Sequence, residues 1–194
     1  NGSSDYVDVG NAASLQIAGT RTIEAWVKWN GFAAWTGLIT KNQSGEGWYL
    51  LQYGTNQQVY FAIWNEAGTN YISRRFNYDF TTGVWYHLAV SWDGTTTDSN
   101  SIKMFVNGVE GEVNVNSANI GAVSDPSGNV NIGRDNGTGG VYFNGIIDEV
   151  KIDNVVRTAD EIAEAYRAGR DHRISKTITS TDLSAKTKLP FYVA

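Results

Sequence analysis

The segment Asp148–Asp153 is the one carboxylate-rich strand that the sequence predicts. A retaining glycoside hydrolase needs two carboxyl groups about 5–5.5 Å apart, on either side of the scissile bond. Residues two apart on a β-strand share a face, so alternation places Glu149, Lys151 and Asp153 together. A lysine stands where the middle carboxylate would be needed. The pattern favours an outward, ion-paired row over an acid and a nucleophile.

The two histidines do not complete a catalytic or metal-binding set. His87 lies in an alternating strand, beside Ala89 and Ser91 on its own face, which is typical of a packing or groove residue. His172 follows in a polar C-terminal stretch. The sequence has no Gly-x-Ser-x-Gly turn to present a nucleophile and no His-x-x-x-His pair to hold zinc. We therefore expect a protein that is not an enzyme.

Aromatic side chains on neighbouring strands indicate a different chemistry, the binding of a sugar. A sugar ring stacks its C–H face on an aromatic ring, and its hydroxyls bond to a few well-placed polar groups in a concave site. In Val59–Trp64 the apolar residues alternate with the aromatic ones, which places the latter on a separate, exposed face. The candidates for ligand binding on this face are Trp48, Tyr60, Trp64, Tyr71 and Arg75.

Trp35 is a further candidate for ligand binding. It lies in a loop between Gly31 and Gly37, where packing within a strand does not explain a large ring. The alternative applies to every aromatic candidate: such residues are favoured on strands and pack across them without any ligand. The sequence leaves both interpretations open.

Short apolar-alternating runs separated by Gly, Asn, Asp, Ser and Thr predict antiparallel strands joined by turns. Asn107-Gly108 is typical of a tight hairpin, because both turn positions need a positive φ angle. The predicted strands are Tyr6–Val9, Thr22–Trp29, Leu38–Lys41, Gly47–Tyr53, Val59–Trp64, Tyr71–Phe76, Trp85–Trp92, Ile102–Val106, Val109–Val115, Asn129–Gly133 and Tyr142–Ile152.

One late segment has the periodicity of a helix. Thr158 is its predicted N-cap, Glu161 completes a capping box, and Gly169 is its predicted end. We therefore expect one domain over residues 1–170. The Ser/Thr/Lys-rich stretch 171–194 is expected to be a linker or the first strand of a following module, or else a strand that docks on a sheet edge.

Composition excludes several classes of protein. The 194 residues include 7 Trp, 10 Tyr and 7 Phe but no Cys, so the chain has apolar surface for a core and no disulfide, thiolate zinc site or cysteine nucleophile. A net charge of −5 gives no basic surface for nucleic acid. No apolar run approaches the roughly 20 residues that span a bilayer, so membrane insertion is not expected.

The start at Asn1 is typical of a mature or excised module.

Five segments together resemble a known family. They are Asp5–Val9, Thr22–Lys28, Trp85–Gly94 with its W-x-H-x-A pattern, Met104–Gly108 and Phe143–Val150 with its F-x-G-x-I-D-E-V pattern. The order of these motifs is similar to that in laminin-G-like domains of the concanavalin A-like lectin/glucanase superfamily. The resemblance implies an all-β jelly-roll sandwich of two antiparallel sheets, one concave and one convex, with one short C-terminal helix.

The same resemblance implies a calcium site. Related domains often hold one structural calcium between the N-terminal segment and the Asp of the closing motif, which here means Asp148 with an oxygen from Ser4 or Asp5. Alternation places Asp148 on the side of Val150 and Ile152, toward a buried layer. A buried carboxylate needs a cation or hydrogen-bond donors, so calcium as a structural cofactor is one of the available interpretations.

The expected function is that of a non-catalytic carbohydrate-binding or adhesion module in a larger extracellular or cell-surface protein. Its partners would be a glycan or another surface ligand, and the neighbouring domains of the same polypeptide. The first alternative is a structural spacer domain with no ligand of its own. The second is a glycan-active enzyme of the same superfamily.

Overall fold

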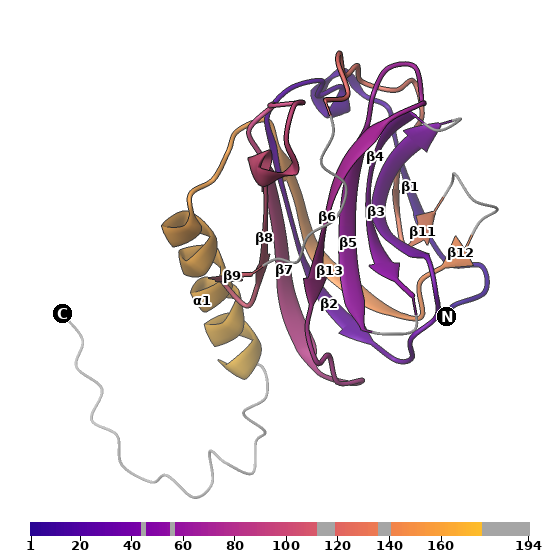
Figure 1. Ribbon diagram of the computed structural model, residues 1–194. Helices are drawn as coiled ribbons and strands as arrows, with labels where there is room; N and C mark the ends of the chain where they lie inside the picture. The colour runs from indigo at the N-terminus through magenta and orange to yellow at the C-terminus, as the bar shows by residue number, and fades with distance from the viewer. Residues whose placement is uncertain (44–45, 55–56, 112–118, 136–140, 176–194) are drawn as a thin grey trace, which may run out of the picture.

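The computed structural model describes residues 1–43, 46–54, 57–111, 119–135 and 141–175 (Figure 1). Within them, two antiparallel sheets pack face to face and a small hairpin lies beside one of them. The six-stranded sheet has the order β1 (Val7–Gly10), β10 (Val130–Ile132), β3 (Thr36–Gln43), β4 (Glu46–Tyr53), β5 (Gln58–Trp64) and β6 (Tyr71–Asn77). The five-stranded sheet has the order β13 (Gly145–Asp153), β2 (Arg21–Trp29), β7 (Trp85–Trp92), β8 (Ile102–Val106) and β9 (Val109–Glu110). The hairpin joins β11 (Arg134–Asp135) to β12 (Val141–Tyr142).

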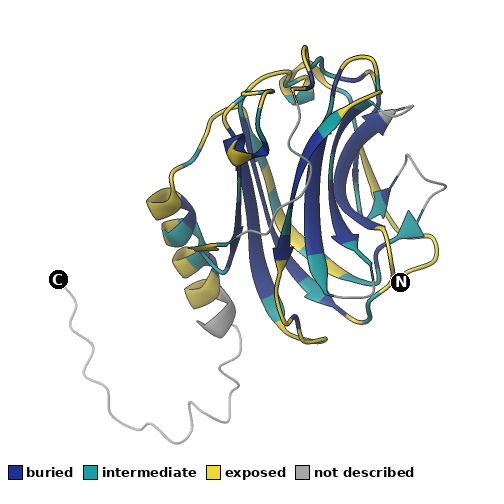
Figure 2. Ribbon diagram, viewed as in Figure 1, coloured by how far each residue is buried: buried dark blue, intermediate teal, exposed yellow. Residues whose placement is uncertain are grey.

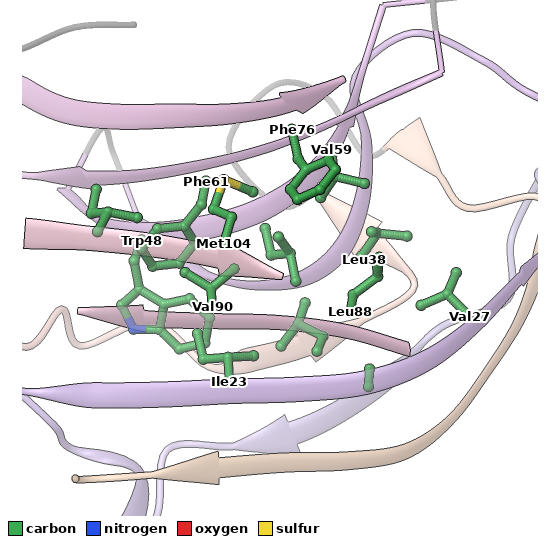
Figure 3. Close-up of a cluster of buried hydrophobic side chains, with 14 of the residues drawn as sticks. Ile23, Val27, Leu38, Trp48, Val59, Phe61, Phe76, Leu88, Val90 and Met104 are labelled. Carbon is green, nitrogen blue, oxygen red and sulfur yellow. The ribbon is translucent and has the colours of Figure 1, made fainter. Parts of the chain in front are cut away.

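The hydrophobic core fills the space between the inner faces of the two sheets. Buried residues dominate the central strands of both sheets (Figure 2). Figure 3 shows side chains from both sheets meeting there, including Phe61 from β5 and Met104 from β8. The fully buried indole of Trp29 packs against several other rings and donates its N–H to Gln52 Oε1 at 2.9 Å. The expected all-β sandwich is therefore confirmed.

The Asn107-Gly108 hairpin is confirmed by its backbone. Asn107 has a φ of 53° and Gly108 a φ of 76°, and the turn connects β8 to β9. Strand β9 is shorter than predicted within the described residues, and 112–115 lie outside them. The predicted strand Tyr142–Ile152 is divided between β12 and β13.

The helix α1 (Ala159–Ser175) covers the outer face of the five-stranded sheet (Figure 1). The predicted capping box is confirmed: the Glu161 N–H donates to Thr158 Oγ1 at 3.3 Å, and the Thr158 N–H donates to Glu161 Oε2 at 2.7 Å. The predicted end at Gly169 is wrong, because the helix continues to Ser175. A Cβ at position 169 would lie 2.5 Å from Trp26 Nε1, so the glycine allows the helix to approach the sheet.

The helix therefore includes residues 171–175 of the segment that we expected to be a linker. Residues 176–194 lie outside the described residues, and their role as a linker or a strand stays a prediction. No helix in the described part of the chain has both the length and the apolar character needed to cross a membrane.

Buried charges fix the loops at one end of the sandwich. Lys41, fully buried on β3, pairs with Asp125 and donates to the Leu15 carbonyl at 2.8 Å. Asp125 also accepts from the Ile17 N–H at 3.1 Å. Arg21 donates to the Ile17 carbonyl at 2.7 Å, and burial lowers its pKa to about 10 while Asp125 opposes that change. These bonds attach two distant loops to the sheet.

Candidate functional site

The outer face of the six-stranded sheet, on the side away from the core, carries a cluster of aromatic rings. In the sheet register Tyr49 lies opposite Ala62, Tyr60 opposite Arg75, and Trp64 opposite Tyr71. Residues paired in this way share a face. We call the rings on this face the outer aromatic cluster: Trp35, Tyr49, Tyr53, Tyr60, Trp64 and Tyr71.

Ring contacts connect the members of the outer aromatic cluster. The centroid of Tyr60 lies 5.9 Å from that of Tyr49 and 5.2 Å from that of Tyr53. Trp64 and Tyr71 pack at 4.5 Å. These separations are typical of aromatic pairs. Tyr49, Tyr53 and Tyr71 also pack against the buried residues Leu51, Tyr60 and Ala62, which joins the two groups of rings into one apolar surface.

Trp35 extends this surface from a loop. It follows the turn before β3, has a φ of 62° and leaves 43 % of its surface exposed. Its ring packs edge-on against Tyr53 at a centroid distance of 4.4 Å and lies 6.4 Å from Tyr60. A non-glycine residue with a φ in this left-handed region is uncommon. The loop thus holds an exposed indole over the sheet.

Arg75 supplies a positive charge at the β6 side of the cluster. Its guanidinium lies 4.9 Å from the centroid of the Tyr53 ring, within the range of a cation–π contact. Its Nη1 donates to Gln58 Oε1 at 3.4 Å, which is a long hydrogen bond. Its Nε is buried and makes no hydrogen bond within the described structure.

The β11–β12 hairpin borders the opposite side of the cluster. Thr40, which lies opposite Tyr49 in the register, donates to the Arg134 carbonyl at 2.9 Å. The Asn42 amide donates to Asp135 Oδ1 at 3.2 Å. At Gly37 a Cβ would lie 2.2 Å from the backbone of Arg134, so only glycine allows this approach. Strand β3 thereby holds a buried carboxylate beside the rings.

Two tyrosine hydroxyls of the cluster, those of Tyr49 and Tyr60, stay protonated at neutral pH. Burial raises the pKa of Tyr49 to about 12, and burial also raises the pKa of Tyr60. Both groups can therefore donate and accept hydrogen bonds at neutral pH. The surface combines neutral hydroxyls, flat rings and one guanidinium.

The predicted place of Trp48 is wrong. It is 2 % exposed and lies in the core beside Phe61 (Figure 3). Its neighbour Tyr49 occupies the outer face. The guanidinium of Arg21 lies 5.6 Å from its ring. A side chain enclosed between the sheets cannot contact a ligand on the outer face. The other five candidates lie on the outer face, where Tyr60 is only 5 % exposed. Tyr49 and Tyr53 lie beside them, although the sequence interpretation did not name them. That any of these residues binds a ligand stays a prediction.

The predicted orientation of Asp148 is also wrong. The register of β13 against β2 shifts between Asp148 and Lys151, and Glu149 has a φ of 51°, which marks a β-bulge. The bulge reverses the alternation: Ile147 and Val150 pack against the core, whereas Asp148 is exposed and lies opposite Trp26 on the outer face of the five-stranded sheet.

The three expected calcium ligands are consequently not brought together. Asp5 lines a cleft with Ile147, whereas Asp148 lies on the other face of that strand. Ser4 donates its hydroxyl to Asp5 Oδ1 at 3.0 Å. Among the described residues, no three His, Cys, Asp or Glu side chains are grouped as metal ligands. These residues do not fit the proposed site.

Removal of the Asp148 carboxylate should leave any effect of calcium on the protein unchanged. We expect Asp148→Ala and the unmodified protein to show the same difference in Tm between excess calcium and a chelator, because a ligand that binds the native state raises Tm by mass action. Thermal unfolding under both conditions checks this. A calcium-dependent shift that disappears in the variant would restore the original assignment.

His87 lies on the outer face of the other sheet, under α1. Its Nε2 lies 3.1 Å from Glu24 Oε2, and both side chains are almost fully buried. Arg157 contacts the second Glu24 oxygen at 3.5 Å and Asp153 at 2.8 Å. His87 is therefore a packing residue. Asp153 pairs with Arg157, which precedes the helix, and not with Lys151.

Comparisons with known proteins identify this fold. A laminin-G-like family model, described as the concanavalin A-like lectin/glucanases superfamily, matches residues 1–163. No curated protein sequence matches the chain. Among solved structures, the CBM40 domain of a Ruminococcus gnavus IT-sialidase, bound to α2,3-sialyllactose, superposes with a TM-score of 0.63 at 18% identity, covering 84% of this chain and 96% of that one.

Two other solved structures show the same fold. A heptameric SAP-like pentraxin from Limulus polyphemus has a TM-score of 0.56 at 14% identity, covering 83% of this chain and 80% of that one. The binding domain of botulinum neurotoxin DC, in complex with a ligand given as SialylT, has a TM-score of 0.56 at 13% identity. That match covers 78% of this chain but only 36% of the toxin domain. At such low identities these likenesses concern the fold alone.

Proposed function

Because the chain belongs to the concanavalin A-like lectin/glucanase superfamily, we propose that it is a non-catalytic carbohydrate-binding module of a larger extracellular or cell-surface protein. Its ligand is a glycan on a surface or in a matrix, and its second set of partners is the neighbouring domains of the same polypeptide. The module attaches its parent protein to that glycan.

The outer aromatic cluster is the observation that carries this proposal. Two of its rings, Trp35 and Trp64, are indoles at opposite ends of a row of tyrosines. Trp35 is exposed and held by its neighbours in one orientation, so little side-chain entropy is lost when a sugar stacks on it. The tyrosine hydroxyls and Arg75 can bond to sugar hydroxyls. Flat apolar surface with a few polar groups is what a sugar ring requires.

The residues on the same face support a binding role without catalysis. The outward residues of β4, β5 and β6 in the described structure include no Asp or Glu, and hydrolysis of a glycosidic bond generally needs two such groups. Two proteins with this fold have been solved with sialyllactose and with SialylT bound. The fold is thus compatible with glycan binding, and the rings are the residues that we propose for the contact.

Substitution of either indole should weaken glycan binding. We expect Trp35→Ala and Trp64→Ala each to lower affinity at least about tenfold, because the loss of a central aromatic contact commonly removes 2 kcal/mol or more. A glycan array identifies a ligand first, and isothermal titration calorimetry then measures the affinity of each variant.

Trp85→Ala is the matched control, because Trp85 lies on β7 in the other sheet, with the Lys28 ammonium 5.1 Å from its ring. Its binding should equal that of the unmodified protein. Full affinity in both outer-cluster variants would place the ligand elsewhere. No binding to any glycan on a broad array would favour the structural spacer, and release of sugar from a polysaccharide would favour the enzyme.

A further inference from the structure

Several cations of the described structure form ion pairs, and Arg75 does not. Lys41 pairs with Asp125, Arg157 with Asp153 and Glu24, Lys103 with Glu110, and Arg170 with Asp171. Within the same described residues, Arg75 has no acidic partner and contacts only Gln58 and the Tyr53 ring. One positive charge therefore lies on the outer face without a counter-ion.

The environment of Arg75 holds this charge in position but does not neutralise it. The side chain is half-buried on β6, directly opposite Tyr60 in the register, so its stem is fixed by the sheet. The Tyr53 ring lies under the guanidinium, and Gln58 accepts one long hydrogen bond at 3.4 Å. The Nε hydrogen has no acceptor. Because the Nε is buried, a ligand would reach the two terminal Nη nitrogens and not the Nε.

From this placement we propose that the glycan bound by the outer aromatic cluster carries a carboxylate, which pairs with Arg75. The inference rests on the proposed function and names its ligand class, an acidic sugar. A guanidinium presents its N–H groups as a planar fork that matches the two oxygens of a carboxylate. The adjoining rings stack on the body of the same sugar or of its neighbour.

Matched pairs of acidic and neutral glycans test the proposal. The first pair is trigalacturonic acid and its methyl ester, and the second is α2,3-sialyllactose and lactose, so that the two pairs distinguish a uronic acid from a sialic acid. We expect the acid of at least one pair to bind at least about tenfold more tightly than its neutral counterpart, because a hydrogen bond to a charged group is worth about that much. Titration calorimetry measures each affinity.

Variants of Arg75 show whether this residue makes the distinction. Arg75→Gln should abolish the preference for the acid, whereas Arg75→Lys, which keeps the charge, should retain part of it. Arg170→Gln is the matched control, because it removes a cation from the helix on the far side of the molecule. Unchanged thermal unfolding of each variant confirms that the fold is intact.

The outcomes separate this proposal from the previous one. A preference for the acid that Arg75→Gln abolishes supports both. Equal affinity for acid and neutral forms, or a preference that survives Arg75→Gln, overturns the role of Arg75 but leaves glycan binding in place. Binding only to neutral glycans on the array likewise overturns the role of Arg75 and leaves glycan binding in place. Absence of binding to every glycan overturns both.

Discussion

Asp125→Ala should destabilise the protein by about 3–5 kcal/mol, because it leaves a buried ammonium without its counter-charge. The Lys41 side chain has no exposed surface, and only 13% of the Asp125 side chain is exposed. The substitution also removes the acceptor of the Ile17 N–H and the negative charge that opposes the lowering of the Arg21 pKa. Unfolding in urea, followed by tryptophan fluorescence, gives the change in free energy.

Glu110→Ala is the control for this experiment. It breaks the Lys103–Glu110 pair, whose side chains are 45% and 38% exposed, and we expect a cost of at most about 1 kcal/mol. The double variant Lys41→Met/Asp125→Leu should recover a large part of the loss, since an apolar pair of similar volume is often as stable as a buried ion pair. If Asp125→Ala and Glu110→Ala lower the free energy of unfolding equally, the buried ion pair stabilises the protein no more than the exposed pair does.

Gly169→Ala should destabilise the protein by about 1–3 kcal/mol, the cost typical of overpacking a tight contact. The same change on an exposed helix surface stabilises by about 0.5–1 kcal/mol, because alanine loses less backbone entropy. Here the new Cβ would lie 2.5 Å from Trp26 Nε1 and 2.8 Å from Trp26 Cε2, so the helix would have to move away from the sheet. Urea unfolding measures the sign of the effect.

The Trp26→Phe background provides the comparison. Phenylalanine lacks the indole nitrogen. In this background Gly169→Ala should therefore lower the free energy of unfolding by less, or raise it. The difference between the two backgrounds is the coupling energy of the pair. Stabilisation by Gly169→Ala in both backgrounds would mean that the contact between α1 and the sheet is loose.

The fold could be predicted because several independent signals agree. Alternating apolar residues, the Asn107-Gly108 turn and the Thr158–Glu161 capping box each specify local structure, and all are present. Gly169 is the exception. A glycine near the end of a helical pattern normally indicates its termination, but here the missing Cβ serves a contact with a residue more than 100 positions away. Such a contact leaves no local signal.

The site could be predicted only in part, because alternation does not say which face of a strand is buried. On β4 both faces carry aromatic rings, Trp48 on one and Tyr49 and Tyr53 on the other. The polar Gln52 shares the face of Trp48 and made that face seem solvent-exposed. In fact Gln52 is buried, because the Trp29 indole supplies the hydrogen bond that its amide oxygen needs.

Asp148 shows a second limit of pattern reading. Every residue of β13 is compatible with regular alternation, and Glu149 is not a residue type that indicates a bulge. The β-bulge at Glu149, marked by its positive φ, adds one residue to β13. The residues of the strand before the bulge therefore point to the opposite faces from those that regular alternation predicts. A one-residue shift is enough to place Asp148 on the face of β13 opposite to the one that the resemblance implied, and calcium binding by this protein stays a prediction.

The backbone at Trp35 carries a cost that the indole itself offsets. A φ of 62° costs a non-glycine residue on the order of 1 kcal/mol, a cost that glycine would not have. Replacing Trp35 by glycine would relieve the backbone, but it would also remove a ring that is 43% exposed and otherwise packs on its neighbours, including Tyr53. Under the proposed function, the side chain that contacts the sugar therefore also holds its own loop in place.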